Sequence, residues 1–155
     1  MANERGTTGA ATAIRQASPA EAHELLQAGY RYVDVRTEKE FAAGHPLGAV
    51  NIPVVFPDPA TGQMTVNPEF LPVVQAHFHK EAALVVGCQA GARSQRAAEM
   101  LAQAGFSRVV NMQGGFGGAR DQQGRTVVAG WSECGLPICR DCGPETSYAA
   151  LRAAN

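Results

Sequence analysis

The sequence has little lysine, little net charge and no long apolar run. Its lysines are Lys39 and Lys80 alone, and 13 Lys and Arg stand against 14 Asp and Glu, which gives a net charge of -1. This balance leaves no basic stripe for a nucleic acid, so we expect no nucleic-acid partner. No stretch reaches the roughly 18 apolar residues of a membrane-spanning helix, and residues 1–16 lack the apolar segment of a signal peptide. We therefore expect no membrane partner and a cytoplasmic protein.

Cysteine is too scarce and too unevenly placed to form a disulfide framework. The chain has 155 residues and four cysteines, three of which (Cys134, Cys139 and Cys142) lie near its C-terminus. Small secreted domains that depend on disulfides are much denser in cysteine. The length suits one ordinary domain with its own hydrophobic core. We expect a single domain whose thiols are free, reactive or metal-bound in a reducing cytosol.

Helix signals and β-branched runs alternate along the chain. Residues 18–29 begin with a capping box and end in a glycine, and Thr37 with Glu40 starts a second, short helix. Residues 56–68 are rich in turn formers and are expected to run over the surface. Further helices are expected at 67–78 and 94–104, and strands at 12–16, 31–35, 48–55, 82–87 and 107–112. This alternation predicts an α/β fold with a parallel sheet and helices on both faces.

One of the predicted strands ends in a cysteine. Cys88 follows the apolar run 82–87, and the loop Gln89–Arg93 separates it from a helix expected to start at Ser94. Ligands of parallel α/β sheets bind outside the carboxyl ends of the strands. Loop N–H groups and a helix N-terminus favour negative charge, and the thiolate is the reactive form of cysteine. The position therefore favours a nucleophilic Cys88 over a buried packing residue.

The residues after Cys88 define what kind of ligand the loop would attract. Gly91 permits a backbone geometry that a side chain would block, and Arg93 supplies a permanent cation. Ala90 and Ala92 bring neither a charge nor a hydroxyl group. We expect Arg93, together with Arg96 one turn into the helix, to attract an anionic substrate.

Three motifs follow one another along the chain: Val33–Pro53 (VDVRTEKEFAAGHPLGAVNIP), Cys88–Ser94 (CQAGARS) and Asn111–Ala119 (NMQGGFGGA). In this order and spacing they resemble the motifs of single-domain rhodaneses, a sulfurtransferase family. The resemblance implies a parallel five-stranded sheet with helices on both faces. The implied organisation is a flexible tail at 1–11, a rhodanese domain at 12–138 and a Cys-containing tail at 139–155.

The resemblance also implies roles for individual residues. Cys88 would be the catalytic residue and would become a persulfide. The residues that surround the substrate would be Gln89, Ala90, Gly91, Ala92, Arg93 and Ser94. Asp34 and Arg36 would support the loop, with an ion pair to Glu40. His45 would support a turn, because sulfur transfer by a preformed thiolate needs no histidine.

These roles imply a sulfurtransferase that moves a sulfane sulfur from thiosulfate or a persulfide donor to a thiol or cyanide acceptor. We expect no cofactor, and as partners a small sulfur donor, a thiol acceptor and a sulfur-accepting protein. One alternative is a cysteine phosphatase or arsenate reductase, but related phosphatases have five residues between Cys and Arg, where this sequence has four. A second alternative is a non-catalytic sulfur-carrier or regulatory module, in which the cysteine is usually lost.

The cysteines near the C-terminus have the spacing C-x4-C-x2-C. A zinc site would need a fourth ligand that no motif supplies, so no metal is assigned. Unpaired thiols on a mobile tail are a second interpretation. In a third, Cys139 and Cys142 act as a redox relay that takes sulfur from the Cys88 persulfide. Cys134, nearer the domain, is expected to be packed.

Overall fold

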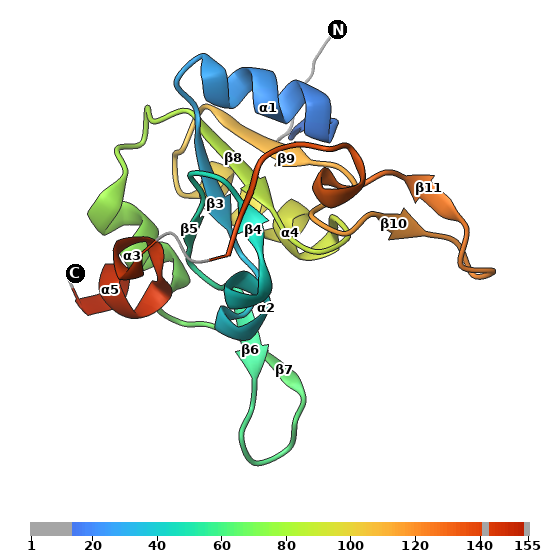
Figure 1. Ribbon diagram of the computed structural model, residues 1–155. Coiled ribbons are helices and arrows are strands. Elements are labelled where there is room, and N and C mark those ends of the chain that lie inside the picture. Colours follow the sequence, from blue (N-terminus) through green and yellow to red (C-terminus); the bar gives the residue numbers. More distant parts are fainter. Residues whose placement is uncertain (1–13, 141–142, 154–155) are drawn as a thin grey trace, which may run out of the picture.

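The centre of the molecule is a five-stranded parallel sheet (Figure 1). The computed structural model describes residues 14–140 and 143–153, so the predicted N-terminal tail at 1–11 lies outside the described residues. The strand order is β2–β9–β8–β3–β5, and each neighbouring pair runs parallel, which confirms the predicted α/β class. The strands are β2 (Arg15–Ala17), β3 (Arg31–Asp34), β5 (Val50–Asn51), β8 (Leu84–Gly87) and β9 (Val109–Met112).

Helices cover both faces of this sheet. One face carries α3 (Phe70–His77), α4 (Ala92–Gln103) and α5 (Tyr148–Ala153), and the other carries α1 (Pro19–Gln27), α2 (Glu38–Ala43) and the 3-10 helix η1 (Trp131–Glu133). Successive side chains of a strand point to opposite faces. Val86 of β8 therefore joins the cluster around α3, α4 and α5, whereas Val85 packs in the cluster that contains Trp131. None of the helices within the described residues has the length and apolarity needed to cross a membrane.

The first two helices begin at the predicted capping boxes. The Ser18 hydroxyl accepts from the backbone N–H of Glu21 at 3.1 Å, and the Glu21 carboxylate accepts from the N–H of Ser18 at 2.9 Å. Thr37 and Glu40 repeat this arrangement at the start of α2. Each box satisfies N–H groups that a helix leaves unpaired at its N-terminus. The second box also fixes the position of Glu40, which binds Arg93 at the start of α4 (Ala92–Gln103).

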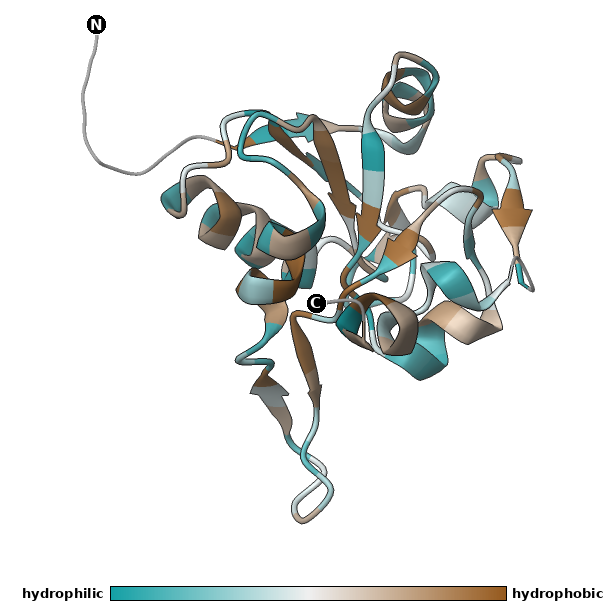
Figure 2. Ribbon diagram, turned by 90° about the vertical axis from the view of Figure 1, so that its left-hand side faces the viewer, coloured by the Kyte–Doolittle hydropathy of each residue, from teal (hydrophilic) through white to brown (hydrophobic). Residues whose placement is uncertain are grey.

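Two antiparallel hairpins project from the sheet (Figure 1). Their strands are β6 (Val55–Pro57), β7 (Met64–Val66), β10 (Ala119–Arg120) and β11 (Thr126–Val128). The first hairpin occupies the stretch that the sequence predicted as an irregular surface segment. Its turn is closed by the N–H of Gly62, which donates to the carbonyl of Asp58 at 2.7 Å. Met64 and Val66 are each 52 % exposed, and Figure 2 shows apolar residues along this hairpin at the bottom of the view.

Two helices start at positions that differ from the expected ones. Helix α3 begins after Glu69, because the side chain of Asn67 accepts from the N–H of Glu69 at 3.0 Å and forms a separate turn. Helix α4 begins at Ala92 rather than at Ser94. Arg93 consequently lies in the first turn of α4.

Two parts of the segment predicted as a C-terminal tail pack on the domain. Strand β12 (Ile138–Cys139) pairs antiparallel with β4 (His45–Pro46). After the 3-10 helix η2 (Pro144–Thr146), α5 buries Tyr148 and Leu151, which are 4 % and 8 % exposed, in the main core. Burial of these two side chains makes α5 part of the domain.

Candidate active site

Cys88 lies at the carboxyl end of β8, the central strand of the sheet. The residue is 1 % exposed. The backbone N–H of Gly91 donates to Cys88 Sγ at 3.0 Å, and α4 begins at the next residue, so that its N-terminal end lies beside the sulfur. Gly91 has a φ of 118°, a left-handed conformation that glycine adopts without strain. This short loop therefore provides an environment that favours negative charge on sulfur.

A glycine-rich segment closes one side of the cysteine loop. The N–H of Phe116 donates to the carbonyl of Cys88 at 2.7 Å, and the N–H of Gly117 donates to the carbonyl of Gln89 at 2.9 Å. A Cβ atom at Gly115 would lie 2.4 Å from the carbonyl oxygen of Cys88. Only a residue without a side chain allows the two backbones to approach this closely. The segment therefore holds the cysteine loop in place through its backbone.

The guanidinium group of Arg36 joins three segments around this loop. Its Nη2 donates to Asp34 Oδ2 at 2.8 Å and to the carbonyl of Gly44 at 2.6 Å, and its Nη1 donates to Gln89 Oε1 at 3.1 Å. The cation also lies 4.6 Å from the centre of the Phe116 ring. Burial raises the pKa of Asp34, and its hydrogen bonds with Arg36 oppose that rise. The pair thus links the end of β3 to the residue that follows Cys88.

Glu40 binds Arg93 and not Arg36. Arg93 Nη1 and Nη2 donate to the two carboxylate oxygens at 2.8 Å and 3.0 Å. The expected Arg36–Glu40 ion pair is wrong because Asp34, two residues before Arg36, already binds that guanidinium group. The permanent cation expected of Arg93 is present in the first turn of α4, but it is paired with Glu40. The hydrogen bonds with Glu40 raise the pKa of the Arg93 guanidinium group, and the charge of Cys88 adds to this rise.

The Glu40–Arg93 pair predicts acid sensitivity. Burial works to raise the pKa of Glu40, but hydrogen bonds from Arg93 and Thr37 outweigh it and lower the pKa from 4.5 to about 2. The carboxylate therefore stabilises the fold above about pH 4.5, and this contribution is lost as the pH falls toward 2. We expect Glu40→Gln to lower the free energy of unfolding by about 1 kcal/mol or less at pH 7, since the pair is partly exposed to solvent. Between about pH 5 and 3, the free energy of unfolding of the variant should fall less steeply than that of the parent protein.

Urea titrations at a series of pH values measure this effect. Glu38→Gln, at an exposed position in the same helix, is the matched control. Its free energy of unfolding should depend on pH as steeply as that of the parent protein. Equal slopes for the two variants would contradict the assignment.

Ser94 lies directly behind Cys88 in the first turns of α4. Its Oγ is 3.4 Å from Cys88 Sγ, 3.2 Å from the carbonyl oxygen of Gly91 and 2.5 Å from Asn111 Oδ1. Asn111 belongs to β9, the strand next to β8, and is 3 % exposed. The sequence reasoning named Ser94 but not Asn111 as a site residue. The signal that could have found Asn111 is its place near the carboxyl end of a neighbouring parallel strand.

An open pocket of about 290 Å³ adjoins the cysteine loop beside the β10–β11 hairpin. Its lining includes Ala90 and Gly91 from the loop, and Asn111 and Gln113 from the end of β9 and the residue after it. Ala90 and Ala92 are exposed and bring no polar side chain to it. The surface of the pocket is more apolar than polar, and its polar side chains are the amides of Gln16, Gln95, Asn111 and Gln113.

The C-terminal cysteines differ in their surroundings. Cys139 is disulfide-bonded, and Cys142 lies outside the described residues. Cys134 is a free thiol and is exposed, so the expectation that it packs is wrong. Trp131 takes the buried position of this turn, and Cys134 ends it at the surface.

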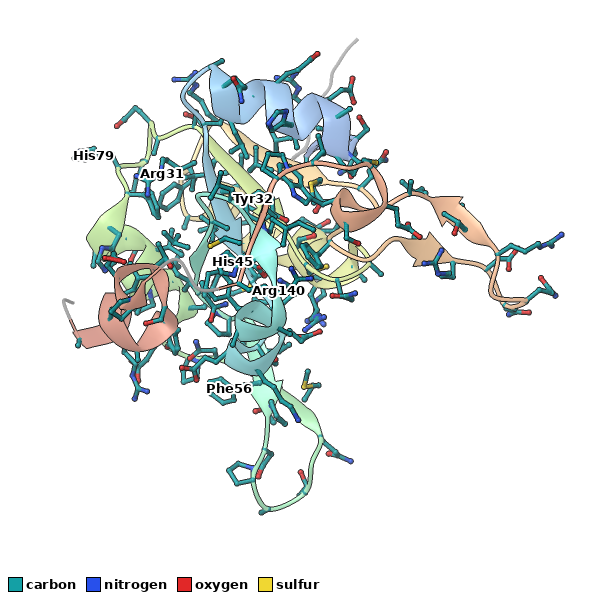
Figure 3. All side chains as sticks on the ribbon, in the orientation of Figure 1. Arg31, Tyr32, His45, Phe56, His79 and Arg140 are labelled. Atoms are coloured by element: carbon teal, nitrogen blue, oxygen red, sulfur yellow. The ribbon has the colours of Figure 1, made fainter. Side chains whose placement is uncertain are left out.

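Strand β12 places the C-terminal segment close to Arg36 and the glycine-rich segment. Cys139 lies opposite His45 in the β12–β4 pair, and Figure 3 shows Arg140 and His45 near each other. A Cβ atom at Gly44 would lie 3.6 Å from the Phe116 ring and 3.8 Å from Arg140. His45 itself stacks on the Phe41 ring and donates from Nδ1 to the Phe41 carbonyl at 2.8 Å. This arrangement holds the turn before β4.

The fold and the site together define a class of protein. This is an α/β protein with a parallel sheet and a buried cysteine in a loop at the carboxyl end of the central strand. The chain belongs to the rhodanese-like family, whose domain model matches residues 18–121. Its relatives include proteins named thiosulfate sulfurtransferases, so the family is one of sulfurtransferases.

Three known proteins illustrate the similarity. The chain is 40 % identical over 116 residues to thiosulfate sulfurtransferase 16, chloroplastic, of Arabidopsis thaliana, with 75 % of this chain and 85 % of that protein covered. It is 38 % identical over 117 residues to rhodanese-like domain-containing protein 15, chloroplastic, of the same plant, with 76 % and 57 % covered, so it spans little more than half of that relative. The crystal structure of Rv0390 from M. tuberculosis has a TM-score of 0.69 at 28 % identity, with 83 % and 99 % covered.

Proposed function

We propose that this protein is a sulfurtransferase that carries a sulfane sulfur on Cys88. The observation that supports the proposal best is the hydrogen bond from the Gly91 N–H to Cys88 Sγ at the start of α4. A donor in this position stabilises a thiolate, and after transfer it stabilises an anionic persulfide. We propose thiosulfate or a persulfide as the donor, and a thiol or cyanide as the acceptor.

The proposed reaction has two displacement steps. The Cys88 thiolate attacks the outer sulfur of thiosulfate, an S–S bond forms, and the bond to the sulfonate sulfur breaks with its electron pair leaving on sulfite. With a persulfide donor, the leaving group is a thiolate. An acceptor thiolate then attacks the outer sulfur of the Cys88 persulfide, becomes a persulfide itself and returns Cys88 to the thiolate.

The charges around the loop favour a donor of low charge. Arg36 is compensated by Asp34 and Arg93 by Glu40, which reduces the attraction that either guanidinium group offers to a doubly charged anion. Arg96 and Arg140 are exposed and lie in strongly screened surroundings. We therefore propose thiol-borne persulfides as better donors than thiosulfate.

Intact-mass measurement tests the proposal. We expect the mass to increase by one sulfur after incubation with thiosulfate or with a low-molecular-weight persulfide, and the added sulfur to leave when cyanide or a thiol is added. Cys134→Ser is the matched control, because Cys134 is the exposed free thiol, and it should load sulfur like the parent protein. No added sulfur with either donor would overturn the proposal and would favour a non-catalytic module.

A phosphatase or arsenate reductase receives less support. Four residues separate Cys88 from Arg93, and the guanidinium group of Arg93 is already bound to both carboxylate oxygens of Glu40. An oxyanion would therefore lack the arginine that such an enzyme needs beside the cysteine.

For the C-terminal cysteines we propose the relay. An external dithiol first reduces the Cys139 disulfide and is itself oxidised to a disulfide. The Cys139 thiolate then attacks the outer sulfur of the Cys88 persulfide and releases the Cys88 thiolate. The Cys142 thiolate then attacks the inner sulfur of the Cys139 persulfide, forms a disulfide and releases hydrosulfide. We expect the Cys88 persulfide to live longer in a Cys139→Ser/Cys142→Ser variant than in the parent protein. Both proteins are first reduced and loaded with sulfur, and the loss of the added sulfur is then followed by intact mass. Equal lifetimes would eliminate the relay.

A further inference from the structure

The hydroxyl group of Ser94 has one proton and three acceptors within reach. The nearest is Asn111 Oδ1 at 2.5 Å, followed by the Gly91 carbonyl at 3.2 Å and Cys88 Sγ at 3.4 Å. The Gly91 carbonyl already accepts from the N–H of Gln95 at 3.2 Å. The direction of this one proton decides whether Ser94 donates to the sulfur or turns a lone pair toward it.

The amide side chains of Gln95, Gln16 and Asn111 form a row of hydrogen bonds that ends at Ser94. The outermost amide, that of Gln95, has only one favourable orientation. Gln95 Nε2 donates to the carboxylate of Glu99 at 3.0 Å, and a carboxylate can only accept. Gln95 Oε1 therefore faces Gln16 and accepts from its Nε2 at 2.7 Å. Gln16 Nε2 also lies 3.2 Å from the carbonyl oxygen of Ile14, which again requires a donor. The Ile14 carbonyl and Gln95 Oε1 thus both require a donor, which fixes the Gln16 amide with its Nε2 toward them.

The orientation of the Gln16 amide in turn fixes that of Asn111, which contacts Ser94. Gln16 Oε1 accepts from Asn111 Nδ2 at 2.8 Å, so Asn111 turns its Oδ1 toward Ser94. Reversing the Asn111 amide would place two oxygen atoms against each other at Gln16. The Ser94 proton is therefore directed to Asn111 and away from Cys88.

We propose that Asn111 is a positioning residue that withholds the Ser94 hydroxyl proton from the sulfur of Cys88. Among the hydrogen bonds of the described residues, the Gly91 N–H is then the one donor directed at Sγ, and Ser94 turns a lone pair toward it. A thiolate with fewer donors is less stabilised and more nucleophilic. The role of this arrangement in sulfur transfer rests on the proposed function, whereas the arrangement of hydrogen-bond donors around Cys88 Sγ does not.

The pH dependence of Cys88 alkylation by iodoacetamide tests this inference without any sulfur transfer. Replacing Asn111 by leucine, which has a similar shape, frees the Ser94 proton to donate to the thiolate. A hydrogen bond to a charged group is worth enough to move the alkylation midpoint of Asn111→Leu to lower pH by about one unit. Peptide mapping separates Cys88 from the exposed Cys134.

The double variant distinguishes positioning from a structural effect. Adding Asn111→Leu to Ser94→Ala should leave the midpoint where Ser94→Ala alone places it, because no hydroxyl group remains to be redirected. The control Asn67→Leu removes another asparagine that is 3 % exposed. The Asn67 side chain bonds Pro53, Tyr148 and Glu69 and not Ser94, so this variant should keep the parent midpoint. Ser94→Ala alone provides a second test should the leucine variant not fold: since the Ser94 proton is directed to Asn111 in the parent protein, removing the hydroxyl group should not raise the midpoint, and a rise would overturn the inference.

An unchanged or higher midpoint in Asn111→Leu would overturn the inference, as would the same downward shift in the Ser94→Ala background. If the shifts appear as expected but no donor loads sulfur on Cys88, the proposed function fails and the inference stands. If sulfur loads normally and the midpoints do not move, the inference fails and the proposed function stands.

Discussion

Cys88→Ser is expected to reduce sulfur transfer to the background rate while leaving the fold intact. Serine occupies nearly the same volume, and its oxygen can still accept the hydrogen bond that the Gly91 N–H gives to Sγ. It cannot form a persulfide, because the transferred sulfur would have to be bonded to oxygen. Loading of sulfur, measured by intact mass, and formation of thiocyanate from cyanide should therefore both disappear.

Two controls make this result interpretable. The melting temperature of Cys88→Ser should stay close to that of the parent protein, since the side chain remains buried at similar size. Cys134→Ser should keep full activity, because that thiol is exposed. Sulfur transfer at the parental rate by Cys88→Ser would show that another group carries the sulfur, and the proposed mechanism would have to be abandoned.

Arg36→Leu is expected to lower the free energy of unfolding by about 3–5 kcal/mol. The change removes the three hydrogen bonds from the Arg36 side chain to the Asp34 carboxylate, which is 1 % exposed, and those to Gly44 and Gln89. A buried carboxylate without its partner is much more costly than an intact pair. Because burial already raises the pKa of Asp34, the carboxyl group of the variant should take up a proton, and its stability should fall as the pH rises.

Urea denaturation at about pH 5 and pH 8 measures both effects, with a larger loss expected at the higher pH. The double variant Asp34→Leu/Arg36→Leu should recover part of the stability, since it leaves no buried charge unpaired. It should not recover activity, because Gln89 still lacks the hydrogen bond that holds the residue after Cys88. A single variant as stable as the parent, or a double variant less stable than Arg36→Leu, would contradict this account.

The sequence predicts what is decided locally. Ser18 with Glu21 and Thr37 with Glu40 form capping boxes from residues three positions apart, and both appear in the structure. The apolar run before Cys88 has the length and composition of a buried parallel strand, so the position of the cysteine could be predicted as well.

Contacts between distant parts of the chain could not be predicted in this way. Arg93 and Glu40 are 53 residues apart, so no local pattern in the sequence links this arginine to that carboxylate. Asn111 and Gln16 are 95 residues apart, and their hydrogen bond depends on the order of strands β2, β9 and β8. Sequence motifs report residue types, whereas partners of this kind depend on the assembled sheet.

The packing of Trp131, Tyr148 and Leu151 has a consequence for where this domain can be cut. These side chains are 0 %, 4 % and 8 % exposed, yet all three lie beyond the stretch 18–121 that matches the family. Strand β2, which pairs with β9, precedes that stretch. A fragment trimmed to the matched residues would expose one edge of the sheet and open both hydrophobic clusters. For this chain, the span that the family model matches is smaller than the span that packs into the two hydrophobic clusters, so an expressed fragment should begin before β2 and end after α5.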